Sequence, residues 1–230
     1  MKRRFEFGRK LRRMFMAVWP ETCPICGNVL LKHETPLCLK CLAQLPRTHS
    51  ERDLPYVGAP GNSIRLVSWF VYDTEHPSHR LIHHIKYHDF RNLARKLGRE
   101  FAMQKYEELK HIDIILPIPI HWTKFLRRTY NQTYEVGLGV SDILLVRVNK
   151  NLFALRPHIT QTRAGRSERE QNVQGIFGIR SPEELNGKHI AILDDVVTTG
   201  ATMYSALKAI LEVTKPASVT FISLTRSRQW

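Results

Sequence analysis

The sequence has no long hydrophobic run. No apolar stretch among its 230 residues approaches the ~20 residues that a membrane-spanning helix requires. A short apolar patch at residues 14–19 follows the basic start, but it is too short and too aromatic for an export signal, and no small-residue cleavage site follows it. We therefore expect a cytoplasmic protein.

Acidic residues are scarce. The chain has 21 Asp and Glu against 35 Lys and Arg, which gives a formal net charge of +14. Such a balance favours anionic partners, namely nucleic acid, phosphorylated metabolites or an acidic membrane face, and it does not distinguish among them. Residues 1–22 form a basic arm suited to phosphates or to peripheral contact with an acidic membrane, although a solvated tail accounts for it equally well.

Cysteine is rare, and its placement is informative. The four cysteines form two pairs, Cys23-Pro-Ile-Cys26 and Cys38-Leu-Lys-Cys41. In a reducing cytosol this clustering indicates metal binding rather than disulfides. Four thiolates leave no open coordination position, so we expect structural Zn²⁺, with a redox pair or an iron–sulfur cluster as the alternatives. Residues 23–50 are then a zinc finger that needs its metal to fold, and the pattern leaves open whether the finger contacts DNA or protein.

The rest of the chain alternates between strand-like and helix-like segments. Residues 51–63 are rich in Pro, Gly and charge and are interpreted as a linker. From residue 64 to residue 230 the alternation predicts one α/β domain. The expected strands cover 64–73, 112–120, 186–195 and 218–224, and the expected helices cover 79–88, 92–109 and the residues after Gly200.

Two familiar phosphate-binding motifs are missing. Gly187-Lys188 is followed by His189 and lacks the earlier glycine of a Walker loop. Gly137-Leu-Gly139 lacks the third glycine of a dinucleotide fingerprint. The sequence therefore argues against a P-loop NTPase and against a dinucleotide-binding domain.

The strongest functional signal is the segment from Ile190 to Thr202. A buried strand ends in Asp194 and Asp195, a turn with Gly200 follows, and a helix begins. Open α/β sheets bind ligands at the carboxyl ends of their strands, and successive backbone N–H groups at a helix start can hold a phosphate. Carboxylates beside such a socket suit the hydroxyls of a sugar. A ribose 5-phosphate presents both features.

This segment resembles the motif that binds 5-phosphoribosyl-1-pyrophosphate (PRPP) in type I phosphoribosyltransferases. The resemblance implies a Rossmann-like fold, with a mostly parallel sheet flanked by helices. It makes Asp194 and Asp195 the catalytic pair that holds the ribose hydroxyls. The loop that holds the 5′-phosphate then consists of Val197, Thr198, Thr199, Gly200, Ala201 and Thr202.

The whole layout resembles the ComF family of competence-associated, amidophosphoribosyltransferase-like proteins. The cysteine pairs match its finger, and segments 81–86, 115–132 and 155–177 are similar to three further family stretches. The family usually has Arg-Gly-Phe-Asn-Gln where this chain has Arg128-Thr-Tyr-Asn-Gln132, which changes the expected backbone of that loop.

The resemblance also implies further contacts to PRPP. Pro119 and Ile120 fall where the superfamily contacts pyrophosphate, and Arg127, Arg128 and Lys86 are candidate cations for the same group. A polar stretch that includes Gln161, Thr162, Arg163, Arg169 and Asn172 is a candidate flap. Ordinary surface cations or helix caps are the alternative reading of all these positions. The pairs His79/His83 and His84/His88 are attributed to a solvated helix face.

The expected function is transfer or handling of a ribose 5-phosphate group with release of pyrophosphate, assisted by Mg²⁺. The family resemblance links it to DNA uptake in natural competence. The alternative is a competence factor without turnover, which binds a nucleotide or single-stranded DNA on the same fold and contacts other competence proteins. An adaptor that uses only its finger is the third reading, and the intact phosphate loop disfavours it.

Overall fold

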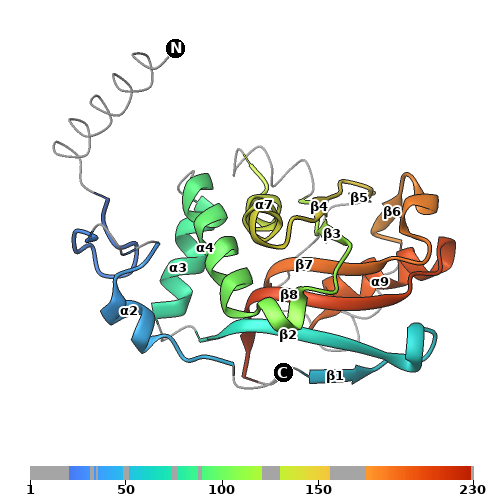
Figure 1. The fold of residues 1–230 in the computed structure, drawn as a ribbon, viewed down its shortest axis with the longest axis horizontal. Coiled ribbons are helices and arrows are strands. Elements are labelled where there is room, and N and C mark those ends of the chain that lie inside the picture. Colours follow the sequence, from blue (N-terminus) through green and yellow to red (C-terminus); the bar gives the residue numbers. More distant parts are fainter. Residues whose placement is uncertain are drawn as a thin grey trace, which may run out of the picture.

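The computed structural model describes residues 21–31, 34, 36–48, 52–73, 77–87, 90–120, 130–155 and 175–228. Within these residues, a six-stranded sheet has the order β1-β2-β8-β7-β3-β4 (Figure 1). β1 and β2 pair antiparallel, and every other neighbouring pair is parallel. Its strands are β1 (Arg52–Pro55), β2 (Ser63–Tyr72), β3 (Ile114–Pro117), β4 (Arg147–Val148), β7 (His189–Val197) and β8 (Ser218–Ser227). The mostly parallel α/β sheet expected from the sequence is confirmed.

Helices cover both faces of this sheet. α3 (Pro77–Tyr87), α4 (Arg91–Gln104) and α7 (Gln132–Leu144) pack on one face, and α9 (Ala201–Val213) packs on the other. The shorter elements are α2 (Leu39–Gln44), α5 (Tyr106–Leu109), the 3₁₀ turns η1 (Pro60–Asn62) and η2 (Pro182–Leu185), and an antiparallel ribbon of β5 (Leu152–Ala154) and β6 (Phe177–Ile179). No helix in the described part of the chain is long and apolar enough to cross a membrane.

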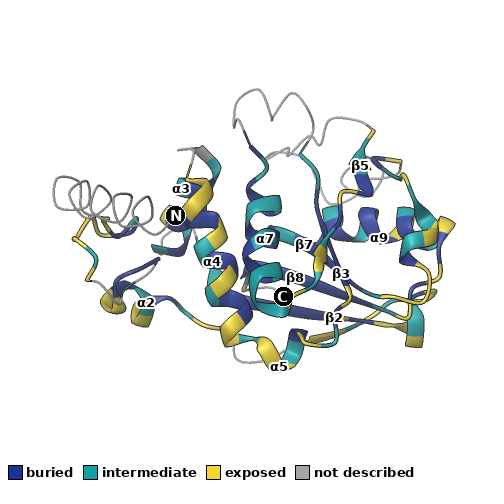
Figure 2. Ribbon diagram, turned by 45° about the horizontal axis from the view of Figure 1, so that its top comes forward, coloured by how far each residue is buried: buried dark blue, intermediate teal, exposed yellow. Residues whose placement is uncertain are grey.

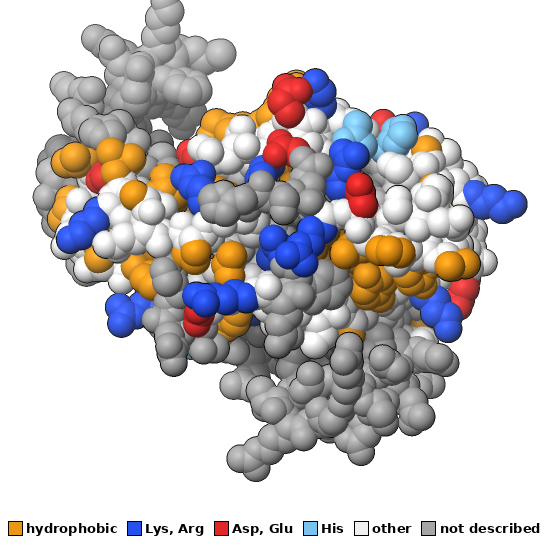
Figure 3. Space-filling model, turned by 90° about the horizontal axis from the view of Figure 1, so that it is seen from below, with side chains coloured by type: hydrophobic (Ala, Val, Ile, Leu, Met, Phe, Trp, Pro, Cys, Tyr) orange, Lys and Arg blue, Asp and Glu red, His pale blue; other side chains and the backbone are white. Residues whose placement is uncertain are grey.

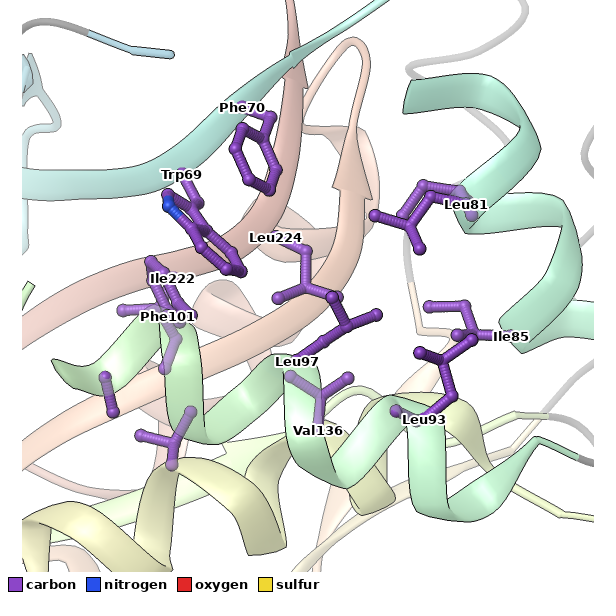
Figure 4. Packing of buried hydrophobic residues seen from close by; sticks show 14 of the residues in the cluster. Trp69, Phe70, Leu81, Ile85, Leu93, Leu97, Phe101, Val136, Ile222 and Leu224 are labelled. Atoms are coloured by element: carbon purple, nitrogen blue, oxygen red, sulfur yellow. The ribbon is translucent and has the colours of Figure 1, made fainter. Parts of the chain in front are cut away.

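The core follows the expected periodicity. Leu93, Leu97 and Phe101, which recur every fourth residue, are all buried along α4. Figure 4 shows these side chains meeting Trp69 and Phe70 of β2, Ile222 and Leu224 of β8, and side chains of α3 and α7. The helix expected at 92–109 is divided, because α4 ends at Gln104 and α5 begins at Tyr106. Buried positions lie along both faces of the central strands (Figure 2).

Glycine allows α4 and α7 to cross closely. A Cβ added at Gly98 would lie 2.1 Å from the carbonyl oxygen of Val136, and a Cβ added at Gly139 would lie 2.0 Å from that of Arg95. Side chains at either position would therefore force the two backbones apart. This packing role explains Gly139, whereas Gly137 faces the side chains of Leu193 and Pro117.

The segment at residues 51–63 is not purely a linker. It contains β1, which pairs with β2 from Arg52 opposite Leu66 to Pro55 opposite Ser63. The segment just before it continues the same edge, since Val71 donates its N–H to the Pro46 carbonyl at 2.7 Å and Thr48 donates to Trp69 at 3.0 Å. Pro55 ends β1, and Gly58, Pro60 and Gly61 lie at the turn around η1. The domain boundaries remain a prediction.

Candidate ligand site and metal centre

The predicted acidic pair lies at the carboxyl end of a central strand. β7 runs between β8 and β3, and its residues 190–193 are fully buried. Two acids follow this apolar run directly, at its carboxyl end. Asp194 and Asp195 occupy that end, at the edge of the sheet where open α/β folds bind ligands.

The loop after β7 forms a small polar pocket. Asp194 and residues 196–203 line it. Thr198 and Thr199 are exposed, and Gly200 takes the left-handed conformation at φ 70°, which a glycine adopts without strain. No side chain caps the start of α9. The first backbone N–H groups of a helix have no partner inside the helix, so this end offers donors and a positive dipole to an anion.

The two aspartates have different surroundings. Asp195 is 4% exposed, and its Oδ2 lies 3.1 Å from Lys86 Nζ and accepts a hydrogen bond of 3.4 Å from Gln132 Nε2. Asp194 lines the pocket and its Oδ1 accepts the N–H of Asp195 at 2.8 Å. Desolvation by burial, together with the negative charge of Asp195, raises the pKa of Asp194 to about 8. Near neutral pH its carboxyl therefore holds a proton for much of the time.

The end of β3 lies beside the acids. Ile118 donates its N–H to the Leu193 carbonyl at 2.8 Å, and the partly exposed Pro119 and Ile120 follow it in the chain. Asn131, the cap of α7, donates its Nδ2 to the Ile118 carbonyl at 3.1 Å. The structure thus places Lys86 beside Asp195 and Ile118 beside β7. Arg127 and Arg128 lie outside the described residues, as do the flap candidates Gln161, Thr162, Arg163, Arg169 and Asn172.

Three site contacts were not predicted from the sequence. Gln132 and Asn131 belong to the Asn-Gln pair that the family comparison singled out, but no role was assigned to them. Ser227, which donates its Oγ to the Thr198 carbonyl at 3.0 Å and so ties the loop to β8, gave no signal at all. The contacts of Gln132 and Ser227 join residues that are 63 and 29 positions apart in the chain, which explains why local patterns missed them.

The four cysteines form a compact cluster. The sulfur atoms of Cys23, Cys26, Cys38 and Cys41 all lie within 4.8 Å of one another, and none is in a disulfide. The sulfurs of Cys26 and Cys38 are 3.7 Å apart, close to the edge of about 3.8 Å that a tetrahedron with Zn–S bonds of ~2.3 Å would have. This donor set fits zinc. Among the described residues, these four cysteines are the group that could hold a metal ion. His79, His83 and His84 are not part of it, and His88 lies outside the described residues.

Local geometry supports the cysteine cluster. Gly27, at φ 77°, closes the first turn and donates its N–H to the Cys23 carbonyl. Glu34 joins the two pairs, since its carboxylate accepts N–H bonds from Leu31 and Leu39 at 2.9 and 2.8 Å. Burial opposes ionisation of Cys23, but N–H groups around its sulfur outweigh burial and lower the pKa of this thiol to about 7. A thiol that ionises near neutral pH can bind a metal readily.

Comparison with known proteins finds similar sequences that carry names from DNA handling. No protein-family model matches the chain. DNA utilization protein YhgH of Escherichia coli is 29% identical over 204 residues, and the match covers 82% of this chain and 83% of YhgH. Competence protein F of Haemophilus influenzae is 26% identical over 212 residues, and that match covers 82% of this chain and 90% of the other.

Solved structures with a similar fold include phosphoribosyl enzymes. One is the allosteric regulatory enzyme of purine biosynthesis, at 16% identity and a TM-score of 0.41. Another is glutamine PRPP amidotransferase from B. subtilis complexed with ADP and GMP, at 16% identity and a TM-score of 0.42. Each match covers 61% of this chain and only 30% of the other chain. This likeness concerns the fold alone.

Proposed function

Because this chain is a homologue of DNA utilization protein YhgH and competence protein F, we propose that it is a competence-type protein that binds PRPP and releases pyrophosphate from it. One observation carries the proposal. The pocket after β7 combines Asp194, two exposed threonines and the uncapped start of α9. A phosphate socket joined to an acid for sugar hydroxyls matches a ribose 5-phosphate group better than a bare phosphate or a base.

Each part of the site has a task in this reaction. The Thr198–Thr202 loop binds the 5′-phosphate, and this binding orients the sugar for the reaction. When the bond between C1 and the pyrophosphate oxygen breaks, its electron pair leaves with pyrophosphate, and a nucleophile forms the new bond to C1. Asp194 then stabilises the positive charge that develops on the ribose ring. We assign the leaving pyrophosphate to Lys86 and residues 118–120, which the Lys86–Asp195 ion pair and the Ile118–Leu193 hydrogen bond support. Mg²⁺ bound with the ligand would neutralise part of the pyrophosphate charge.

The decisive experiment is calorimetry of the zinc-loaded full chain with PRPP and Mg²⁺. Replacing both acids, in D194N/D195N, is expected to abolish binding, because the cations of the ligand favour the charged form of Asp194 and each hydrogen bond to a charged acceptor is worth about 1.5–3 kcal/mol. D53N is the matched control, because Asp53 is an exposed acid on the remote strand β1. Unchanged affinity in D194N/D195N would refute the site. Failure of the unmodified protein to bind PRPP would refute the function.

The second candidate is a DNA-binding role without turnover. The names of the two homologues and the net charge of +14 favour it. On the face shown in Figure 3, however, Lys and Arg side chains are spread among apolar ones. The basic arm at residues 1–22 is then the segment that would bind single-stranded DNA, competence proteins or an acidic membrane.

Two assays separate these candidates. Release of pyrophosphate from PRPP in the presence of candidate nucleophiles reports turnover, and its absence despite PRPP binding favours the role without turnover. Electrophoretic shifts with single-stranded DNA across a salt series report the second role, because phosphate contacts weaken steeply as salt rises. A variant that lacks residues 1–20 should lose the shift and keep PRPP affinity. Equal shifts with and without the arm would place DNA binding elsewhere.

A further inference from the structure

The neighbouring aspartates of the site face different partners. Asp194 lines the loop pocket, whereas Asp195 is not among the lining residues. Asp195 is held instead by Lys86 of α3 and Gln132 of α7, both on its Oδ2. A carboxylate that already accepts two donors, and that is only 4% exposed, is poorly placed to accept sugar hydroxyls as well.

We propose that Asp195 is a positioning residue that holds the Lys86 ammonium at the site, so that Asp194 alone meets the sugar hydroxyls and Lys86 meets the pyrophosphate end of the ligand. The inference rests on the proposed function and assigns different roles to the two aspartates. It replaces the expectation that both acids bind the ribose.

Lys86 is suited to this role by its exposure and its donors. Its side chain is 22% exposed, so part of the ammonium group faces solvent while the rest is covered. An ammonium group has three N–H donors, so it can contact Asp195 and a phosphoryl group at the same time. Replacing Asp195 would remove the carboxylate that fixes the direction of this largely buried cation.

The support around Lys86 is rigid. Tyr130 donates its hydroxyl to the Ile85 carbonyl, which ties the last turn of α3 to the start of α7, and Arg91 lies over the Tyr130 ring at 5.3 Å. Lys86 is the next residue after Ile85. Its backbone position is therefore fixed by the same contact, and only the direction of the side chain is left for Asp195 to set.

Gln132 is the third member of this group. It is 3% exposed, it opens α7, and it donates Nε2 to Asp195. Its Oε1 is buried and accepts no hydrogen bond from the described residues. An unpaired buried carbonyl costs free energy, so a glutamine at this position is better explained by its bond to Asp195 than by core packing.

The test compares two ligands that differ only in pyrophosphate. Ribose 5-phosphate offers the phosphate and the sugar hydroxyls, and PRPP adds pyrophosphate at C1. Calorimetry of the zinc-loaded chain with each ligand and Mg²⁺ gives a ratio of the two affinities. D194N should weaken both ligands by at least about tenfold and preserve the ratio. K86M and D195N should leave ribose 5-phosphate within about threefold and reduce the ratio by at least about tenfold.

Coupling between the two residues is the second readout. If Asp195 acts through Lys86, the double variant K86M/D195N should show the ratio of K86M alone, because the second change removes nothing further. The double variant also replaces the charged pair together, so it remains testable if D195N alone does not fold. Q132L should shift the ratio in the same direction by a smaller factor, and D53N should not change it.

Three results would overturn the inference. If D195N weakens binding of ribose 5-phosphate as much as D194N does, Asp195 is a direct sugar ligand. If K86M and D195N act additively, the two residues act independently. If K86M leaves the ratio unchanged, the ion pair is structural. If the unmodified protein binds neither ligand, the proposed function fails first, and this outcome is distinct from the other three.

Discussion

At the residue scale, the fold changes the chemistry of Asp194 strongly. Its strand and loop neighbours remove water from the carboxyl, and the charge of Asp195 lies next to it, so its pKa rises from 3.8 to about 8. The charge of Lys86 opposes this rise without cancelling it. An acid that is mostly protonated at neutral pH can donate a hydrogen bond as well as accept one, and ligand cations would favour its charged form.

This shift predicts how stability depends on pH. Between pH 4 and 8 the folded protein holds a proton on Asp194 that the unfolded chain has lost, so this residue makes the free energy of unfolding fall as pH rises, by at most about 1.4 kcal/mol per pH unit. D194N removes the titration. Urea unfolding at pH 5, 6, 7 and 8 should therefore show D194N gaining on the unmodified protein with each step.

The Cys23 thiol also titrates in this range. Because both proteins contain it, the difference between their stability curves reports the substitution at Asp194. D53N should follow the unmodified protein throughout. Parallel curves for D194N and the unmodified protein would show that the carboxyl ionises normally in the fold.

At the scale of elements, the crossing of α4 and α7 sets the geometry of the site. α7 begins with Gln132, which contacts Asp195, and α4 packs on it where Gly98 and Gly139 remove side chains. Two arginines of α4 also reach Asp142 of α7, Arg95 at 2.6 Å and Arg99 at 2.8 Å. The helix distance is therefore fixed by backbone contact and by ion pairs.

Substitutions at neighbouring glycines of α7 test this packing. In G139A the new Cβ would meet the Arg95 carbonyl oxygen at 2.0 Å, whereas in G137A it would meet Leu193 Cδ2 at 3.2 Å. Both variants gain the same helix propensity, up to ~1 kcal/mol. G139A should still lose about 1–3 kcal/mol or more of stability, because a backbone cannot yield as a side chain does. G137A should stay near neutral in urea unfolding.

The outcome also bears on the ligand site. If α7 moves in G139A, PRPP affinity should fall together with stability, while G137A keeps both. A stable G139A would mean that the helices can separate without cost, and the close crossing would not be what fixes Gln132.

At the scale of the whole molecule, the sequence predicts the local elements better than it predicts the contacts between residues that are distant in the chain. The strand, turn and helix from Ile190 to Thr202 could be predicted because strand burial, paired acids and Gly200 are all local. The Asp195 contacts could not be, since Gln132 is 63 residues away in the chain. The segment 51–63 looked like a linker because composition reports turns well and edge strands poorly. Its pairing with β2 depends on a partner that composition does not reveal.

The finger is less separate from the main domain in the structure than the sequence predicts. The sequence separates residues 23–50 as a block that needs metal to fold. In the structure Cys23, Cys41 and Leu45 share one buried cluster with Trp69 and Phe101 of the main domain, and the finger lies beside α3 and α4 (Figure 1). Lys96 of α4 also contacts Glu21 at 2.6 Å. The finger therefore contributes to the main core as well as to its own.

This continuity predicts that metal removal weakens the whole molecule. Trp69 is 2% exposed and stacks on Phe70 at 4.2 Å, so its fluorescence reports the main core. In a variant that keeps Trp69 as its single tryptophan, chelation of zinc or C41S should lower the melting temperature of the Trp69 signal by several degrees, since a structural zinc site stabilises the fold that contains it.

E34Q should lower this melting temperature by less, because it weakens the link between the cysteine pairs and keeps all four thiols. If the Trp69 transition stays in place while the finger melts separately, the finger is an independent unit. A shared shift would instead mean that loss of zinc reaches β2 and, through the β2–β8 and β8–β7 pairings, the strand that carries both aspartates.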